Sequence, residues 1–158
     1  MPLHLRVLHP VFAAEASGVD LTRPLADRDI AAIHDAMNTH AVLVFRRQTL
    51  TAQQQMQFAA AFGELDTGLK RVFKRPERLE DERLIDISNV DADGSVSRRD
   101  APKNLSNFAN QLWHSDSSFM DPRAAYSMLY CLVTPSWGGQ TEFADLRHAC
   151  DTLDARTR

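Results

Sequence analysis

The chain has 158 residues and ordinary globular composition, with 44% hydrophobic and 25% charged residues, so disorder is disfavoured. The formal net charge of −3 gives no electrostatic support to nucleic-acid binding, and no apolar run reaches the roughly 18 residues that a membrane span needs. The N-terminus lacks the pattern of a secretory signal and only two cysteines are present, so we expect a cytoplasmic protein without a disulfide scaffold.

The first half of the chain carries both strand and helix signals. Apolar residues at helical spacing predict a helix over 27–38, capped by Asp27. Thr51-x-x-Gln54 has the pattern of a capping box and predicts a second helix, which Gly63 is expected to end. Short apolar runs predict strands at 5–8, 18–21 and 41–45.

Strand signals dominate the second half of the chain. Alternation or enrichment in aromatic and apolar residues predicts strands at 84–89, 126–133 and 140–144. Between them, the dipeptide 93–94 is a turn signal, and the polar stretch 90–110 has no periodicity, as is typical of functional or mobile loops. A third helix is expected from Asp145, and the chain stops inside that pattern, so we expect a truncated chain.

This order of elements favours the α+β class. Strands do not alternate regularly with helices, which disfavours a doubly wound parallel sheet. An antiparallel sheet that forms part of a barrel or jelly roll fits the pattern better.

The segment 107–119 is the richest in polar and aromatic residues. Within it, His114-x-Asp116 places an imidazole and a carboxylate two residues apart, so that on a strand both face one side. Two histidines and one carboxylate form the facial triad of non-haem Fe(II) oxygenases. The spacing alone is weak evidence, because composition gives about 0.6 such pairs by chance. Trp113 and Phe119 flank the pair and are expected to supply a dry wall. A zinc hydrolase stays open, although HExxH and a cysteine pair are missing.

Two longer runs make the pattern specific: NQLWHSDSSF at 110–119 and GGQTEF at 138–143. Together they resemble the taurine dioxygenase family of Fe(II)- and 2-oxoglutarate-dependent oxygenases. The resemblance extends over nearly the whole chain but covers only about the first half of such an enzyme. It implies an incomplete double-stranded β-helix, or jelly-roll, fold with flanking helices, in which residues 1–158 are the N-terminal part of a single domain.

The resemblance also implies site residues. His114 and Asp116 match the first two iron ligands of the family. Thr141 matches the threonine whose hydroxyl binds the co-substrate 2-oxoglutarate, and Asn110 matches a residue near the co-substrate and the substrate.

Other parts of the family's site are less complete in this chain. Arg71, or its neighbour Lys70, falls in the loop that approaches the substrate, where a cation suits a carboxylate. The second iron histidine and the arginine that binds the co-substrate carboxylate lie beyond residue 158 in the family. His148 follows the His-x-Asp pair, but it lies in the last expected helix and is a weak candidate for the third ligand.

The implied activity uses Fe(II), 2-oxoglutarate and O₂ to hydroxylate an aryloxyalkanoate such as 2,4-dichlorophenoxyacetate, giving a phenol, glyoxylate, succinate and CO₂. A taurine-type sulfonate dioxygenase stays open, and so does a non-catalytic fragment, because two functional residues of the family are absent. The expected partner is a small-molecule carboxylate, with neither nucleic acid nor membrane, while a homo-oligomer stays open. We expect the 158-residue chain alone to be inactive.

Overall fold

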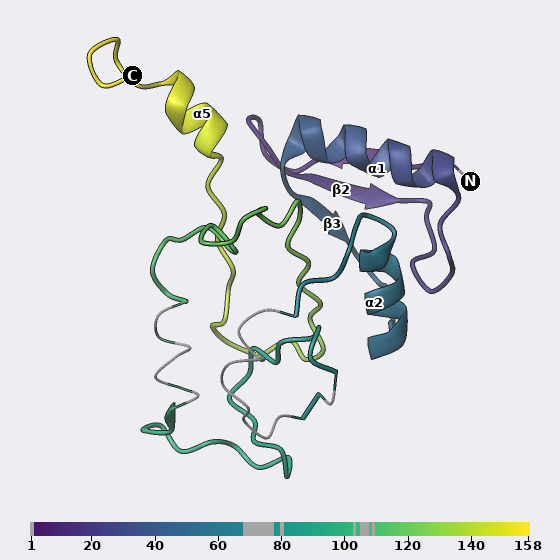
Figure 1. The fold of residues 1–158 in the computed structure, drawn as a ribbon, viewed down its shortest axis with the longest axis vertical. Helices are drawn as coiled ribbons and strands as arrows, with labels where there is room; N and C mark the ends of the chain where they lie inside the picture. Colours follow the sequence, from purple (N-terminus) through teal and green to yellow (C-terminus); the bar gives the residue numbers. More distant parts are fainter. Residues whose placement is uncertain (1, 68–77, 80, 103, 105–107, 109) are drawn as a thin grey trace. The chain divides into compact units, whose positions relative to one another are not determined.

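The computed structural model describes residues 2–67, 78–79, 81–102, 104, 108 and 110–158 (Figure 1). The chain divides into two compact units. Unit 1 consists of Met1–Ala61 and Leu129–Arg158, and unit 2 consists of Phe62–Met128. Across the described residues, no helix is long and apolar enough to cross a bilayer.

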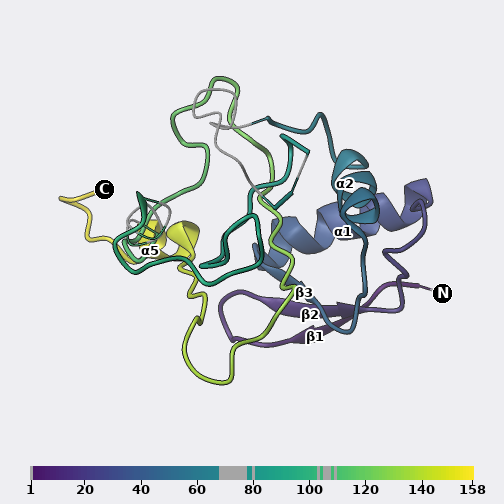
Figure 2. The ribbon, with the colours of Figure 1, turned by 90° about the horizontal axis from the view of Figure 1, so that it is seen from below.

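A three-stranded sheet forms the base of unit 1. Its strands are β1 (His4–Val7), β2 (Ala14–Ser17) and β3 (Leu43–Phe45), in the order β1-β2-β3. β1 pairs with β2 in the antiparallel direction, whereas β2 and β3 are parallel. Helix α1 (Asp27–His40) connects the two parallel strands and lies over one face of the sheet (Figure 2).

Small residues on β2 form the core of unit 1. Ala14 and Ala16 are buried, and because strand residues alternate between faces, both point to the same side. Ile33 and Ala36 are the buried residues of α1. The methyl side chains on the strand allow close approach of a helix, so this packing depends on their small size.

The opposite face of β2 carries charge. Glu15 lies directly across from Arg6 of β1 in the register and forms an ion pair with it. The same carboxylate accepts a hydrogen bond from Nε of Arg46, 3.2 Å away, just beyond β3. Arg6, with a smaller effect of Arg46, holds the pKa of Glu15 below its ordinary value. One carboxylate therefore links the three strands on this face.

Helix α2 (Ala52–Ala60) begins at the predicted capping box. The Gln54 backbone N–H donates to Oγ1 of Thr51 at 3.2 Å, and the Thr51 N–H donates to Oε1 of Gln54 at 2.9 Å. The ring of Phe58 meets that of Phe45 edge-on, with 5.9 Å between centroids. The cap fixes where the helix starts, and the aromatic pair holds it against β3.

Helix α5 (Leu146–Asp151) is tied to the end of α1 through one arginine. Asp145 caps the helix by accepting the Arg147 backbone N–H at 2.9 Å. Its carboxylate also accepts Nη2 of Arg147 at 2.9 Å, and Nη1 of the same guanidinium donates to the Asn38 carbonyl at 2.5 Å. Arg147 thus satisfies a carbonyl in the last turn of α1. The side-chain hydrogen bond from Arg147 lowers the pKa of Asp145 from 3.8 to about 2.

Unit 2 contains a tight reversal of the chain. Val90 and Val96 form an isolated antiparallel bridge, and the Gly94 N–H donates to the Asp91 carbonyl at 2.9 Å between them. This confirms the turn predicted at 93–94.

A buried carboxylate anchors the segment that enters this turn. Asp86, whose side chain is 5% exposed, accepts Nε and Nη2 of Arg78 at 3.1 and 3.2 Å. The Ser88 hydroxyl donates to the same carboxylate and accepts the Val90 N–H. Such a connected network gives the turn a fixed base.

Two predicted elements have different limits from those expected. The strand predicted at 18–21 is wrong, since β2 ends at Ser17 and Gly18 turns with φ +88°. β3 is shorter than 41–45 because Ala41 has a left-handed φ of +59° that interrupts the strand.

The predicted helices also shift at their ends. α1 extends to His40, and its N-cap is Ala26 rather than Asp27, without a side-chain cap. α2 ends at Ala60, so Gly63 does not cap it.

The strands predicted at 84–89, 126–133 and 140–144 are wrong, since all three segments are irregular. A strand requires a hydrogen-bonded neighbour, and no described segment pairs with them. Their apolar side chains stay exposed, as for Ile85 and Val133. The antiparallel sheet is corrected to a mixed one, and the described residues contain no complete jelly roll.

We predict that Gly18→Ala destabilises the protein more than Gly94→Ala. Both glycines have left-handed φ values, +88° and +86°, so each substitution costs about 1–2 kcal/mol of backbone strain. Only at Gly18 does a Cβ meet backbone, 2.5 Å from the Pro2 carbonyl oxygen, which adds about 1–3 kcal/mol. Urea unfolding measures both losses, and equal values would contradict the steric account.

The pair of Asp145 and Arg147 predicts a pH dependence of stability. The pKa of Asp145 is lowered to about 2 in the fold, so its contribution is fully present above 3.8 and is lost as pH falls through about 2. The difference in urea midpoint between the wild type and Asp145→Asn is therefore expected to be largest above pH 5 and to shrink toward pH 2. Arg147→Gln should move this loss to higher pH. A difference independent of pH would contradict the assignment.

Candidate metal centre

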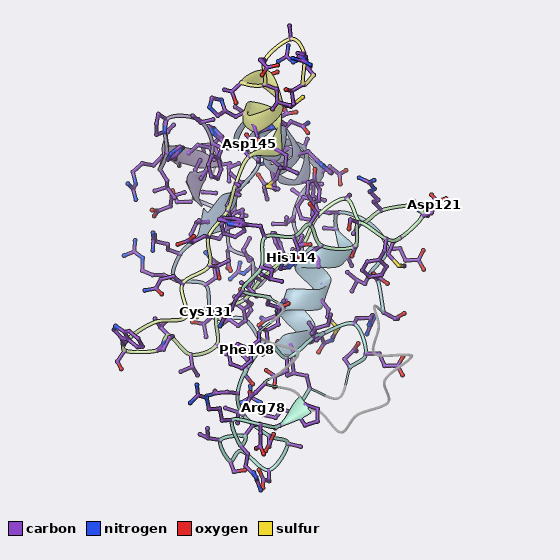
Figure 3. All side chains as sticks on the ribbon, turned by 90° about the vertical axis from the view of Figure 1, so that its left-hand side faces the viewer. Arg78, Phe108, His114, Asp121, Cys131 and Asp145 are labelled. Carbon is purple, nitrogen blue, oxygen red and sulfur yellow. The ribbon has the colours of Figure 1, made fainter. Side chains whose placement is uncertain are left out.

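His114 and Asp116 converge in unit 2, on the segment labelled by His114 in Figure 3. Nε2 of His114 lies 3.2 Å from Oδ1 of Asp116. The expectation that a strand aligns them is wrong, because the segment is irregular and Asp116 enters a turn. Ser117 follows with φ +50°, and its carbonyl accepts the Met120 N–H at 3.0 Å. The turn achieves the convergence that a strand was expected to give.

The backbone fixes the orientation of the imidazole. Nδ1 of His114 lies 2.7 Å from the Leu112 carbonyl oxygen. A carbonyl only accepts hydrogen bonds, so Nδ1 carries a proton, and Nε2 is the nitrogen that faces the carboxylate. Metal-binding histidines are commonly held by such a bond from their second ring nitrogen.

The donor pair fits a divalent cation. With Nε2 unprotonated, the nitrogen and the Asp116 carboxylate, 3.2 Å apart, both offer lone pairs, and a divalent cation can take the place of the proton that otherwise joins them. Adjacent ligands of an octahedral ion with metal–ligand distances of about 2.1 Å lie about 3 Å apart. The observed separation therefore suits two neighbouring corners of one coordination sphere.

The third protein ligand of a facial triad is not found in the part of the chain that the structure describes. No group of three histidine, cysteine, aspartate or glutamate residues gathers there as a metal site. His148 lies in α5 of unit 1, where its carbonyl accepts the Thr152 N–H. His114 and Asp116 thus stand as a pair.

The other predicted site residues fall in different places. Asn110 lies in unit 2, exposed, four residues before His114. Thr141 lies in unit 1, just after two left-handed glycines, and its hydroxyl has no hydrogen-bond partner among the described residues. Lys70 and Arg71 lie outside the described residues.

The described residues do not form the expected dry wall around His114 and Asp116. Trp113 and Phe119 are 70% and 69% exposed, since no described segment packs over them. Sequence reasoning also missed the role of Leu112, because it acts through its carbonyl, which every residue has.

Comparison with known proteins places these residues in a family. The model of the taurine catabolism dioxygenase TauD, TfdA family matches residues 4–158. The chain belongs to this family. It is 50% identical over 146 residues to the alpha-ketoglutarate-dependent 2,4-dichlorophenoxyacetate dioxygenase of Cupriavidus pinatubonensis, covering 92% of this chain and 51% of that protein.

Two further members of the family agree with this match. The 2,4-dichlorophenoxyacetate dioxygenase of a Burkholderia species is 46% identical over 153 residues, 97% of this chain and 52% of that protein. The crystal structure of AAD-2 with Mn(II) and N-oxalylglycine superposes with a TM-score of 0.86 at 39% identity, covering 99% of this chain and 52% of AAD-2. The chain thus spans about half the length of these relatives and shares the fold of the matching part of AAD-2.

We predict that His114→Ala and Asp116→Asn each weaken binding of Mn(II) to the whole protein by at least about 100-fold. Loss of a second ring-nitrogen partner costs 10- to 100-fold in metal sites, so loss of a ligand should exceed it. His148→Gln is the matched control and should change the affinity less than about twofold. Isothermal titration calorimetry measures all three. Equal weakening by the His148 variant would contradict the pairing of ligands.

Proposed function

We propose that residues 1–158 are the N-terminal part of an Fe(II)- and 2-oxoglutarate-dependent dioxygenase that acts on aryloxyalkanoates such as 2,4-dichlorophenoxyacetate. The observation that carries the proposal is the convergence of His114 and Asp116, with Nε2 of the imidazole 3.2 Å from the carboxylate and Nδ1 held by the backbone. This pair lies in a chain that is 50% identical to a dioxygenase named for that substrate.

The extent of the chain supports its being one part of a larger domain. It covers 51% and 52% of two relatives named as 2,4-dichlorophenoxyacetate dioxygenases. Large apolar side chains in its second half are exposed, among them Val133 at 81% and Trp137 at 90%. Further chain that pairs with 126–133 and 140–144 would bury them and complete the jelly roll, and it would carry the second histidine and the arginine that the family resemblance implies.

His114 and Asp116 are proposed to hold Fe(II) from adjacent positions, while AAD-2 was crystallised with Mn(II), another divalent ion, and with N-oxalylglycine, an analogue of 2-oxoglutarate. When bound, iron with 2-oxoglutarate and O₂ supplies the oxidising power that hydroxylates the carbon beside the ether oxygen, so that a phenol and glyoxylate result beside succinate and CO₂.

The chain's own groups position the reactants. Thr141 is proposed to donate its unpartnered hydroxyl to a carboxylate of 2-oxoglutarate, and Asn110 to lie beside the co-substrate and substrate. Lys70 and Arg71 are proposed as cations of the substrate loop, on the sequence resemblance alone. The Leu112 carbonyl keeps the proton of His114 on Nδ1 and leaves Nε2 free to bind the metal.

A cytoplasmic location is part of the proposal. Cys131 and Cys150 are both free and exposed, a state that a reducing environment such as the cytoplasm preserves.

Turnover by the whole protein tests the proposed activity. With Fe(II), 2-oxoglutarate and O₂, 2,4-dichlorophenoxyacetate is expected to give succinate and the phenol in equal amounts, and the 158-residue chain alone is expected to give neither. Asp116→Ala should abolish both products because it removes a metal ligand. Sulfite from taurine without any phenol would replace the proposal by a sulfonate dioxygenase. Absence of both products would indicate a non-catalytic protein.

A further inference from the structure

Most arginines that the structure describes pair with a carboxylate. Arg98 and Arg99, adjacent in unit 2, differ in whether they form such an ion pair. Nη2 of Arg98 lies 3.0 Å from Oδ2 of Asp100, whereas Arg99 forms no ion pair or hydrogen bond with any described residue. An unpaired guanidinium keeps its full charge and its five donors for a ligand.

Arg99 lines a hollow of about 360 Å³ in unit 2. The described residues that line it lie within or next to the polar stretch 90–110, and none is an aspartate or glutamate: Asn89, Ser97, Arg99, Asn104, Phe108 and Gln111. Arg47 lines a hollow in unit 1, but there Asp20 lines the same space. Of these two hollows, the one at Arg99 therefore has a cation and no carboxylate among its described lining residues.

Hydrogen bonds fix the backbone around the hollow. Ser97 is buried, and its N–H donates to the Asn89 carbonyl at 2.8 Å. The Ser97 hydroxyl donates a hydrogen bond to the Asp91 carboxylate. Nδ2 of Asn104 donates to the Arg98 carbonyl at 2.7 Å, which fixes the backbone just before Arg99. The guanidinium thus rises from an ordered base, which lowers the entropic cost of binding.

The lining indicates the chemistry of the ligand. A guanidinium fork binds a carboxylate through two parallel hydrogen bonds, and the amides of Asn89 and Gln111 add neutral donors. The Phe108 ring, labelled in Figure 3, offers an apolar wall for an aromatic body. A small organic acid with an aromatic ring meets all of these groups.

The position of the hollow suits the proposed reaction. In an aryloxyacetate the carbon to be hydroxylated is bonded directly to the carboxylate carbon, so the group that binds the carboxylate must lie near the metal. Gln111 lines the hollow and precedes His114 by three residues, so their Cα atoms lie within about 11 Å.

We propose that Arg99 binds the carboxylate of the substrate in this hollow and so determines specificity for organic acids, an inference that rests on the function proposed above. Arg98, its neighbour, keeps a structural pairing with Asp100 and has no part in substrate binding. This assigns the substrate a cation within the described residues, in addition to Lys70 and Arg71, which are proposed from the sequence resemblance.

Binding of an acid and its neutral amide to the whole protein tests the proposal. Arg99→Gln is expected to weaken binding of phenoxyacetate by about 10- to 100-fold, since charge-assisted hydrogen bonds are lost, and to leave phenoxyacetamide within about twofold. Arg99→Lys keeps the charge without the fork and should be intermediate. Arg98→Gln is the matched control and should bind both compounds as the wild type does. Calorimetry on metal-loaded protein gives the affinities, and thermal unfolding checks that each variant is folded.

Two results would overturn the proposal. One is unchanged affinity of Arg99→Gln for phenoxyacetate, and the other is equal weakening for acid and amide, which indicates a structural role. The binding measurement needs no turnover, so it is independent of the activity assay. If the wild type releases no phenol, the proposed function fails, whereas an Arg99→Gln variant that binds the acid normally in an active enzyme refutes only the role of Arg99.

Discussion

The hydrogen bond between Nδ1 of His114 and the Leu112 carbonyl is the constraint on which the site depends. It holds Nδ1 at the backbone, so that Nε2 is the ring nitrogen that faces Asp116 and can bind a metal ion. Because the acceptor is backbone, the geometry follows from the path of residues 112–117 and not from the side chain at position 112. A change in that path would separate imidazole from carboxylate even if both residues were kept, so the short turn after Asp116 is part of the metal centre.

What could be predicted from the sequence is what depends on neighbours along the chain. The capping box of Thr51 and Gln54, the turn at 93–94 and the helix start at Asp145 each rest on hydrogen bonds within a few residues, and all three are present. The strands at 126–133 and 140–144 depend on partners far away in sequence. Alternation records which face of a strand is apolar, but not whether a neighbour is there to pair with it.

In the site, too, some features could be predicted from the sequence and others depend on the three-dimensional arrangement. The spacing of His114 and Asp116 predicted their convergence correctly, although for a strand that is not formed, because residues two apart can meet in a turn as well. Nothing in the sequence distinguishes Arg98 from Arg99, which are adjacent and chemically identical. Their difference lies in whether a carboxylate is within reach, and that depends on how the turn and its frame are arranged in space.

Charge pairing connects the fold to its proposed selectivity. Glu15 is neutralised between Arg6 and Arg46, and Arg147 is held by Asp145 at the end of α1, so these cations add little attraction for an anion. Arg99, by contrast, has no carboxylate partner among the described residues and lines a hollow. Attraction alone does not separate a carboxylate from a sulfonate, since each carries one charge. The guanidinium fork does not separate them either, because its two parallel donors pair with two oxygens of a planar carboxylate or of a tetrahedral oxyanion. The selectivity that Arg99 supplies is therefore for an anion over a neutral compound of the same shape, such as the amide of the acid.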